Sequence, residues 1–217
     1  MTRVRCVLFD LDGTLVDTAP DLGHAANCVR EELGLPPLPI VRYRPVASAG
    51  ARGLLGVALD MKPEHADYPR HRDRFLALYR EHLSRGSRVF EGLDAVLRGF
   101  ERGGIRWGVV TNKPGWLTRP LMDELALAPR AACSISGDDV PRAKPAPDSL
   151  LLACTQLALK PDDCVYVGDD LRDIAAARAA GMRSIAVRWG YLGEGGPIES
   201  WGADRIIDQP HELADCI

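Results

Sequence analysis

The sequence predicts an α/β fold: a doubly wound, parallel, Rossmann-like sheet with helices on both faces, plus an all-helical cap domain inserted after the first strand. Three observations support this fold class. Val4 and residues 6–9 form a nearly continuous apolar run without alternation, as expected of a strand buried on both faces. From residue 89 onward, apolar strand-like runs alternate with helical patterns, which is typical of a parallel sheet. Residues 17–88, in contrast, show helical patterns only.

The first of these helical patterns begins near Thr18, which offers a capping side chain, and has Pro20 in its first turn. It ends at Gly34. A second helix is expected over residues 49–59, and Pro63 suits the start of a third. An uninterrupted block of helices inside an alternating chain indicates an inserted domain.

The predicted domain boundaries follow from this block. Residues 1–16 and 89–217 are predicted to form the α/β core domain, and residues 17–88 the helical cap domain. Within the second part of the core, the expected helices cover residues 92–103, 114–127, 145–157 and 170–180. The expected strands cover residues 105–110, 132–135, 164–167, 184–187 and 205–207.

Composition narrows the possible functions. The chain has 217 residues, of which 46% are hydrophobic and 26% charged, as in ordinary soluble proteins. A net charge of −3 gives no electrostatic support for binding nucleic acid or a membrane surface. Arg3 and Arg5 precede an apolar run that is too short for a signal peptide or a membrane span, so we expect a cytoplasmic protein. The six cysteines form no CxxC pair and are expected to be free.

Two carboxylates stand at the end of the first expected strand. Asp10 and Asp12 are two residues apart, so in an extended chain their side chains leave on the same side. Like charges this close do not both stay ionised unless a cation lies nearby. Gly13 permits a sharp turn, and Thr14 offers a hydroxyl and an amide to an anion. A cation site and an anion site are therefore expected at one strand end.

Two further polar groups follow later strands, at the edge where an open parallel sheet binds its ligands. Thr111, Asn112 and Lys113 follow the second expected core strand, although Thr-Asn in this position is most often a turn or a helix cap. Lys144 precedes Pro145, and a lone lysine is nearly always solvated. Pro145 suits the first position of a helix, which would place Lys144 at a helix N-terminus, aimed at the first carboxylates.

Three acids follow another buried strand. A single acid at a helix start is usually a cap, and we expect that role for Asp170. Capping does not require the two further acids, Asp169 and Asp173. The repulsion among these carboxylates indicates a bound divalent cation.

In this order, the four groups resemble the four motifs of the haloacid dehalogenase superfamily of phosphohydrolases, and the resemblance spans the whole chain. It implies that Asp10 is the nucleophile and Asp12 the general acid and base. Thr111 would hold the phosphate, and Lys144 would neutralise the nucleophile and the transferring phosphoryl group. The implied cofactor is Mg²⁺, with Asp10, Asp12, Asp169 and Asp173 as its ligands. Asp12 argues against dehalogenation, because a leaving halide needs no proton.

The resemblance also implies a cap that closes over the site and contacts the substrate, a small phosphorylated metabolite. Residues 48–53 of the cap are expected over the pocket, where Arg52 could pair with a polar group of the substrate. Arg52 could equally be a solvated arginine at the end of a helix, without contact to the substrate. The same two alternatives, substrate contact or a solvated side chain, apply to Lys113. The expected substrate-binding residues are Thr14, Asn112, Lys113 and Arg52. The histidines His24, His65, His71 and His82 lack metal-ligand spacing on any one face, and we expect surface or capping positions for them.

Within the superfamily the chain is most similar to phosphoglycolate phosphatases, through its motifs and the stretch at residues 187–191. Phosphatases of N-acetylmuramic acid 6-phosphate and other phosphosugars share these features. Two other enzymes remain open, a phosphosugar mutase and a pyrophosphatase, as does a phospho-accepting module without turnover. Asp12 and Lys144 together disfavour the last, because a mere acceptor has no leaving alkoxide to protonate. A monomer or a homodimer is expected.

Overall fold

The computed structural model describes residues 4–217, so Arg3 lies outside the described residues. Six parallel strands form the main sheet, in the order β5-β4-β1-β6-β7-β8. They are β1 (Cys6–Phe9), β4 (Arg106–Val110), β5 (Ser134–Ile135), β6 (Cys164–Gly168), β7 (Arg183–Val187) and β8 (Arg205–Ile207). This order is that of a doubly wound sheet, and the predicted fold class is confirmed.

Strand β1 lies between β4 and β6, at the point where the strand order reverses. Its four residues are fully buried because their side chains alternate between two hydrophobic clusters. Val7 and Phe9 belong to one cluster, and Cys6 and Leu8 belong to the other. The unbroken apolar run in the sequence is therefore the mark of a central strand with both faces covered.

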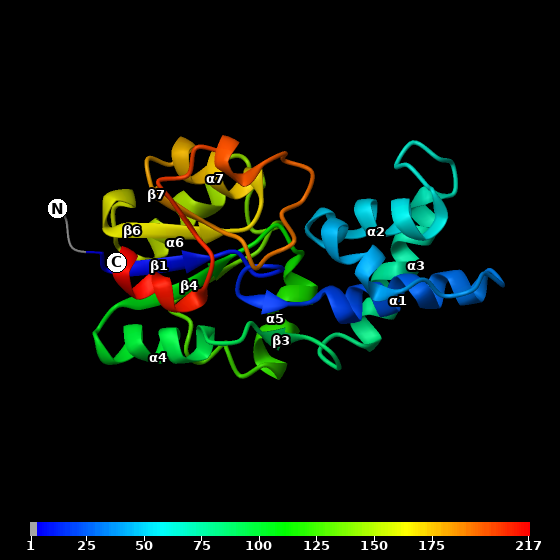
Figure 1. Ribbon diagram of the computed structural model, residues 1–217, viewed down its shortest axis with the longest axis horizontal. Helices are drawn as coiled ribbons and strands as arrows, with labels where there is room; N and C mark the ends of the chain where they lie inside the picture. The colour runs from blue at the N-terminus through cyan, green and yellow to red at the C-terminus, as the bar shows by residue number, and fades with distance from the viewer. Residues whose placement is uncertain (1–3) are drawn as a thin grey trace.

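Helices cover both faces of the sheet (Figure 1). Helices α4 (Leu93–Arg102) and α5 (Gly115–Glu124) supply buried residues to the cluster that contains Phe9. Helices α6 (Asp148–Leu157) and α7 (Leu171–Ala179) supply buried residues to the cluster that contains Leu8. The strands run toward the cap, so the carboxyl ends that carry the motif residues form the edge of the core nearest the cap.

A helical cap extends from this edge (Figure 1). It contains α1 (Ala19–Glu32), α2 (Gly50–Leu59) and α3 (Tyr68–Glu81), and α1 packs against both other helices. In residues 4–217, no helix is both long and apolar enough to cross a membrane.

The chain passes between core and cap through two short strands that pair antiparallel, β2 (Val16–Asp17) and β3 (Arg88–Val89). Next to them, the Asp21 carboxylate accepts hydrogen bonds from the backbone of Gly86 and from the backbone and hydroxyl of Ser87. The two crossings are thus tied to each other. The boundaries at residues 17 and 88 remain a prediction for where the two domains divide.

Three helix starts differ from expectation. Thr18 is the N-cap residue of α1, but its side chain makes no capping hydrogen bond because its hydroxyl donates to Asp12 instead. Helix α3 begins at Tyr68 rather than at Pro63, and a later proline occupies its first turn. Helix α6 begins only at Asp148, so Pro145, which follows Lys144 in a cis peptide, does not open it. Among the histidines, His65 is exposed as expected, but His71 is buried.

Candidate active site

The turn after β1 brings Asp10 next to the start of α7. The backbone amide of Asp10 donates to Val167 on β6, and its side chain is buried at the sheet edge. Gly13 has a φ of 93°, and a Cβ there would lie 2.3 Å from Oδ2 of Asp169, so only glycine fits this turn. The hydroxyl of Thr14 donates to Oδ1 of Asp169 at 2.7 Å. This turn therefore joins the first and fourth motifs.

Lys144 is buried among the acids that the sequence analysis selected. Its ammonium donates to Oδ1 of Asp10 and Oδ1 of Asp173, each at 2.7 Å. It also donates to the Tyr166 hydroxyl at 2.7 Å, and this hydroxyl in turn donates to the backbone oxygen of Val110. A buried cation shared by two carboxylates is held at one fixed point.

Asn112, not a helix N-terminus, fixes the backbone of Lys144. Its amide nitrogen donates to the carbonyl of Lys144 and its amide oxygen accepts from the Lys144 N–H, both at 2.9 Å. Thr111 lies beside it, buried, with its hydroxyl accepting from the backbone of Lys113. Asn112 thus holds the loop that carries Lys144, and its predicted role in substrate binding stays a prediction.

Asp10, Asp169 and Asp173 form a buried acidic cluster, with one oxygen from each lying within 4.8 Å of the others. Burial raises the pKa of Asp10 to about 6; the Lys144 charge opposes this shift and the Asp173 charge adds to it. Burial, with the charges of Asp10 and Asp173, raises the pKa of Asp169 to about 8. Carboxylates destabilised in this way would be stabilised by a cation, and an all-oxygen donor set suits a hard divalent ion such as Mg²⁺.

Asp12 points away from this cluster. Its Oδ1 accepts from the Thr18 hydroxyl at 2.6 Å and from the Lys113 ammonium at 2.9 Å. Burial alone would lower the pKa of Lys113, but Asp12 and Tyr79 raise it above its ordinary value. The side chain of Asp12 therefore lies in a different environment from Asp10, and its assignment as a metal ligand stays a prediction.

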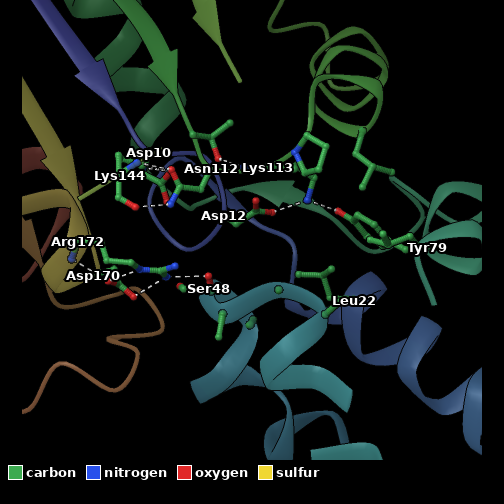
Figure 2. A pocket seen from close by; sticks show the side chains of 18 of the residues that line it. Asp10, Asp12, Leu22, Ser48, Tyr79, Asn112, Lys113, Lys144, Asp170 and Arg172 are labelled. Atoms are coloured by element: carbon green, nitrogen blue, oxygen red, sulfur yellow. Dashed lines mark hydrogen bonds and ion pairs between the residues drawn. The ribbon is translucent and has the colours of Figure 1, made fainter. Parts of the chain in front are cut away.

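A cavity of about 330 Å³ lies between these groups and the cap (Figure 2). Its core side carries Asp10, Asp12, Thr111, Lys113 and Lys144. Its cap side is mostly apolar and is formed by Leu22, Ala47, Ser48, Ala49, Gly50, Ala51, Phe75, Leu76 and Tyr79. The cavity is thus polar on its core side and mostly apolar on its cap side.

The structure places Arg52 outside this cavity. Its side chain is 60% exposed and lies 3.8 Å from Glu194. Arg172 lines the cavity instead, where it donates to the backbone oxygen of Ser48 at 2.8 Å and to both oxygens of Asp170. Asp170 also caps α7 by accepting from the backbone of Arg172, as predicted.

Four aromatic or basic residues of the site were missed by sequence reasoning: Arg172, Tyr79, Tyr166 and Tyr191. Arg172 lies inside the fourth motif, so its position did offer a signal. Tyr191, whose backbone amide donates to Oδ2 of Asp169, lies in the stretch that supports the subfamily resemblance. Tyr79 and Tyr166 fit the apolar periodicity of their elements, so the sequence pattern gives no sign that their hydroxyl groups belong to the site.

The chain is similar to known hydrolases in sequence and in fold. The family described as haloacid dehalogenase-like hydrolase matches residues 7–187. The N-acetylmuramic acid 6-phosphate phosphatase of Pseudomonas aeruginosa is 42% identical over 215 residues, covering 99% of this chain and 95% of that protein. A phosphoglycolate phosphatase of Xanthomonas campestris pv. campestris is 44% identical over 213 residues, covering 96% of this chain and 94% of that protein. The crystal structure of a predicted phosphoglycolate phosphatase from Haemophilus somnus matches with a TM-score of 0.87 and 27% identity, covering 100% and 99% of the two chains.

Proposed function

The chain belongs to the haloacid dehalogenase-like hydrolases as a phosphoric monoester hydrolase, and we propose that it cleaves a small phosphorylated metabolite through an aspartyl phosphate on Asp10. The observation that carries this mechanism is that Asp10, Lys144 and Asp173 line one cavity, with Asp169 close to both of these carboxylates. These groups come from strand ends that are far apart in the sequence.

Lys144 prepares Asp10 for attack. It holds Oδ1 of Asp10 at 2.7 Å, which leaves Oδ2 as the attacking atom of this cavity-lining residue. A phosphate dianion repels a carboxylate, and the Lys144 ammonium reduces this repulsion. When held by Asp10, Asp169 and Asp173, Mg²⁺ would supply further positive charge for the phosphoryl oxygens. Attack forms the Asp10–phosphorus bond and breaks the bond from phosphorus to the substrate oxygen.

Asp12 is the proposed acid and base. In its protonated form it gives its proton to the leaving alkoxide, and as the carboxylate it then takes a proton from the attacking water. That water breaks the acyl phosphate and releases inorganic phosphate, which restores Asp10. Asp12 lines the same cavity as Asp10 but has its own hydrogen-bond partners, so one group can transfer protons while the other bonds to phosphorus.

The cavity favours a phosphosugar over 2-phosphoglycolate. Each of its three cationic side chains already pairs with a carboxylate: Lys144 with Asp10 and Asp173, Lys113 with Asp12, and Arg172 with Asp170. The carboxylate of 2-phosphoglycolate lies next to its phosphate and would need a cation of its own. The apolar cap side of the cavity instead suits the carbon skeleton and the N-acetyl methyl group of a sugar such as N-acetylmuramic acid 6-phosphate. Sequence identity to the two kinds of relative is similar and does not separate them.

Release of inorganic phosphate from a panel of monoesters with Mg²⁺ tests this proposal. The panel contains N-acetylmuramic acid 6-phosphate, N-acetylglucosamine 6-phosphate and 2-phosphoglycolate. We expect the highest kcat/KM for a phosphosugar. Turnover of 2-phosphoglycolate alone would contradict the substrate preference, and no phosphate from any monoester would contradict the activity. A requirement for a sugar bisphosphate would instead indicate a mutase.

A further inference from the structure

One buried contact joins the cap directly to the proposed acid and base. The ammonium of Lys113 donates to Oδ1 of Asp12 and to the hydroxyl of Tyr79, both at 2.9 Å (Figure 2). Tyr79 comes from α3 of the cap, whereas Lys113 follows β4 of the core. The ammonium also lies 4.5 Å from the centre of the Tyr79 ring.

Both side chains are withdrawn from water. Tyr79 has no exposed surface, and the Lys113 side chain is 6% exposed. An ammonium buried to this degree has to be paired and hydrogen-bonded, and Asp12 and Tyr79 are the two partners given above. Removing the Tyr79 hydroxyl would leave one ammonium N–H without an acceptor, so Lys113 would shift to find another one. Asp12 would then keep only the Thr18 hydroxyl of the two partners described above and would be held less firmly.

We propose that Tyr79 is a positioning residue of the cap, which sets the orientation of Asp12 through Lys113. The proposal rests on the proposed function, in which Asp12 protonates the leaving group. It assigns Lys113 to the proton-transfer machinery rather than to substrate binding. It also makes proton transfer depend on the seating of α3 against the core, so that Asp12 is fully oriented only beneath a closed cap.

The leaving group of the substrate provides the test. An alkoxide leaving group needs a proton from Asp12, whereas p-nitrophenolate is stable without one. For Tyr79→Phe, we expect kcat/KM to fall roughly tenfold for a phosphosugar but less than about threefold for p-nitrophenyl phosphate. Lys113→Met should show the same pattern, with a fall of about 10²-fold for the phosphosugar. Tyr68→Phe removes a phenol from the first turn of the same helix and serves as the matched control with unchanged rates.

Equal losses for both substrates in Tyr79→Phe would assign a merely structural role to this residue and overturn the proposal, as would unchanged rates for both. These outcomes require an active wild-type enzyme. A wild-type protein without activity toward any monoester would instead refute the proposed function, so the two failures are distinguishable.

A second, independent observation lies within the cap itself. His24 and Cys28 are one turn apart on α1, and His82 follows directly after α3. One donor atom from each of the three lies within 4.8 Å of the others, and Sγ of Cys28 is 3.5 Å from Nε2 of His24. The Nδ1 atom of His82 is buried and makes no hydrogen bond within the described residues. None of the three lines the active-site cavity.

We infer that these side chains form a transition-metal site that links α1 to the end of α3. Two imidazoles and a thiolate are ligands for Zn²⁺ and similar ions, in contrast to the all-oxygen cluster of the active site. The exposure of His24 leaves room for water as a fourth ligand. Spacing along one helix did not reveal the site, because its third member, His82, follows the end of a second helix.

Co²⁺ added to the EDTA-treated full-length protein tests this inference. A thiolate ligand gives a charge-transfer band in the near ultraviolet that oxygen ligands do not give, so the active site cannot produce it. We expect this band at one equivalent of Co²⁺, its loss in Cys28→Ser and its displacement by Zn²⁺. Cys216→Ser removes another partly exposed cysteine and should retain the band. Absence of the band in the wild type, or its persistence in Cys28→Ser, would overturn the inference.

Discussion

Asp10 and Asp12 are two residues apart, yet charge is balanced differently around them. Near Asp10, three carboxylates are buried together, and the ammonium of Lys144 pairs with two of them, Asp10 and Asp173. Near Asp12, one carboxylate faces the ammonium of Lys113. The Thr18 hydroxyl also donates to this carboxylate, and the Tyr79 hydroxyl accepts from the ammonium. The first region lacks positive charge and suits a metal ion and a phosphoryl group. The second is closer to neutral and suits a group that has to gain and lose a proton.

The largest effect is expected from Asp10→Asn, which removes the nucleophile from the acidic region. Phosphate release should fall at least roughly 10⁴-fold, because an amide does not form the acyl phosphate. Asp148→Asn provides the matched control, since this carboxylate pairs with Arg142 on the surface. Undiminished turnover in Asp10→Asn, with the fold checked by circular dichroism, would refute the assignment of the nucleophile.

The next effect is expected from Asp12→Asn and depends on the substrate. A phosphosugar should react about 10²-fold to 10⁴-fold more slowly, because its alkoxide leaves without a proton. The first step with p-nitrophenyl phosphate, measured as kcat/KM, should change much less. An equal loss for both substrates would mean that Asp12 does not act as the general acid and that the two regions do not divide the chemistry.

A smaller effect is expected on stability. In the absence of metal, the acidic region around Asp10 should make the free energy of unfolding depend on pH. The pKa of Asp169 in the folded protein is raised from 3.8 to about 8, so its protonated form favours folding. This contribution is complete below the unfolded pKa and disappears as the pH rises through the folded pKa. The free energy of unfolding of EDTA-treated protein should therefore fall between pH 4 and pH 8.

Asp169→Asn is the matched variant for this measurement, because it removes the titrating group and should flatten the pH dependence. Mg²⁺ should raise the thermal unfolding midpoint of the wild type at pH 8 and have a weaker effect on the variant. A wild-type stability that rises over this pH range would contradict the account of the acidic cluster.

The smallest effect is expected at the rim of the cap. Arg52→Ala should change kcat/KM less than about twofold, because the Arg52 side chain is exposed and lies outside the cavity. Arg172→Ala is the informative partner, since it removes the contact between α7 and the backbone of Ser48 and should raise KM. A larger loss in Arg52→Ala than in Arg172→Ala would show that the cap closes in a different orientation.

Much of the fold could be predicted because the core follows simple patterns. The buried run at β1 and the alternation of strands and helices led to the sheet, and the edge of a parallel sheet collected the motif residues. Helix starts were less predictable where a polar side chain has a distant partner. Thr18 has the side chain of a cap, but its hydroxyl contacts Asp12.

The site was predictable where charge was concentrated and unpredictable where aromatic residues supply a single polar atom. Asp10 and Asp169 stand out as charges directly after apolar strands. Lys144 stands out only by its place before Pro145, although Pro145 does not open α6. Tyr79 and Tyr166 occupy positions where any large apolar residue would satisfy the packing, so the sequence does not reveal that each accepts a hydrogen bond from a buried lysine. Such contacts depend on the relative placement of elements, which periodicity does not encode.

The hydrogen bonds between Asp21 and residues 86–87 constrain how the cap can move relative to the core. Strand β2 pairs with β3, and Asp21 binds the chain just before β3. The two segments that connect the core to the cap are therefore held together as one two-stranded linker. Rotation about one segment alone would break these bonds, so the helices should swing as a unit about this linker. A proteolytic nick in either segment should accordingly leave the two fragments associated.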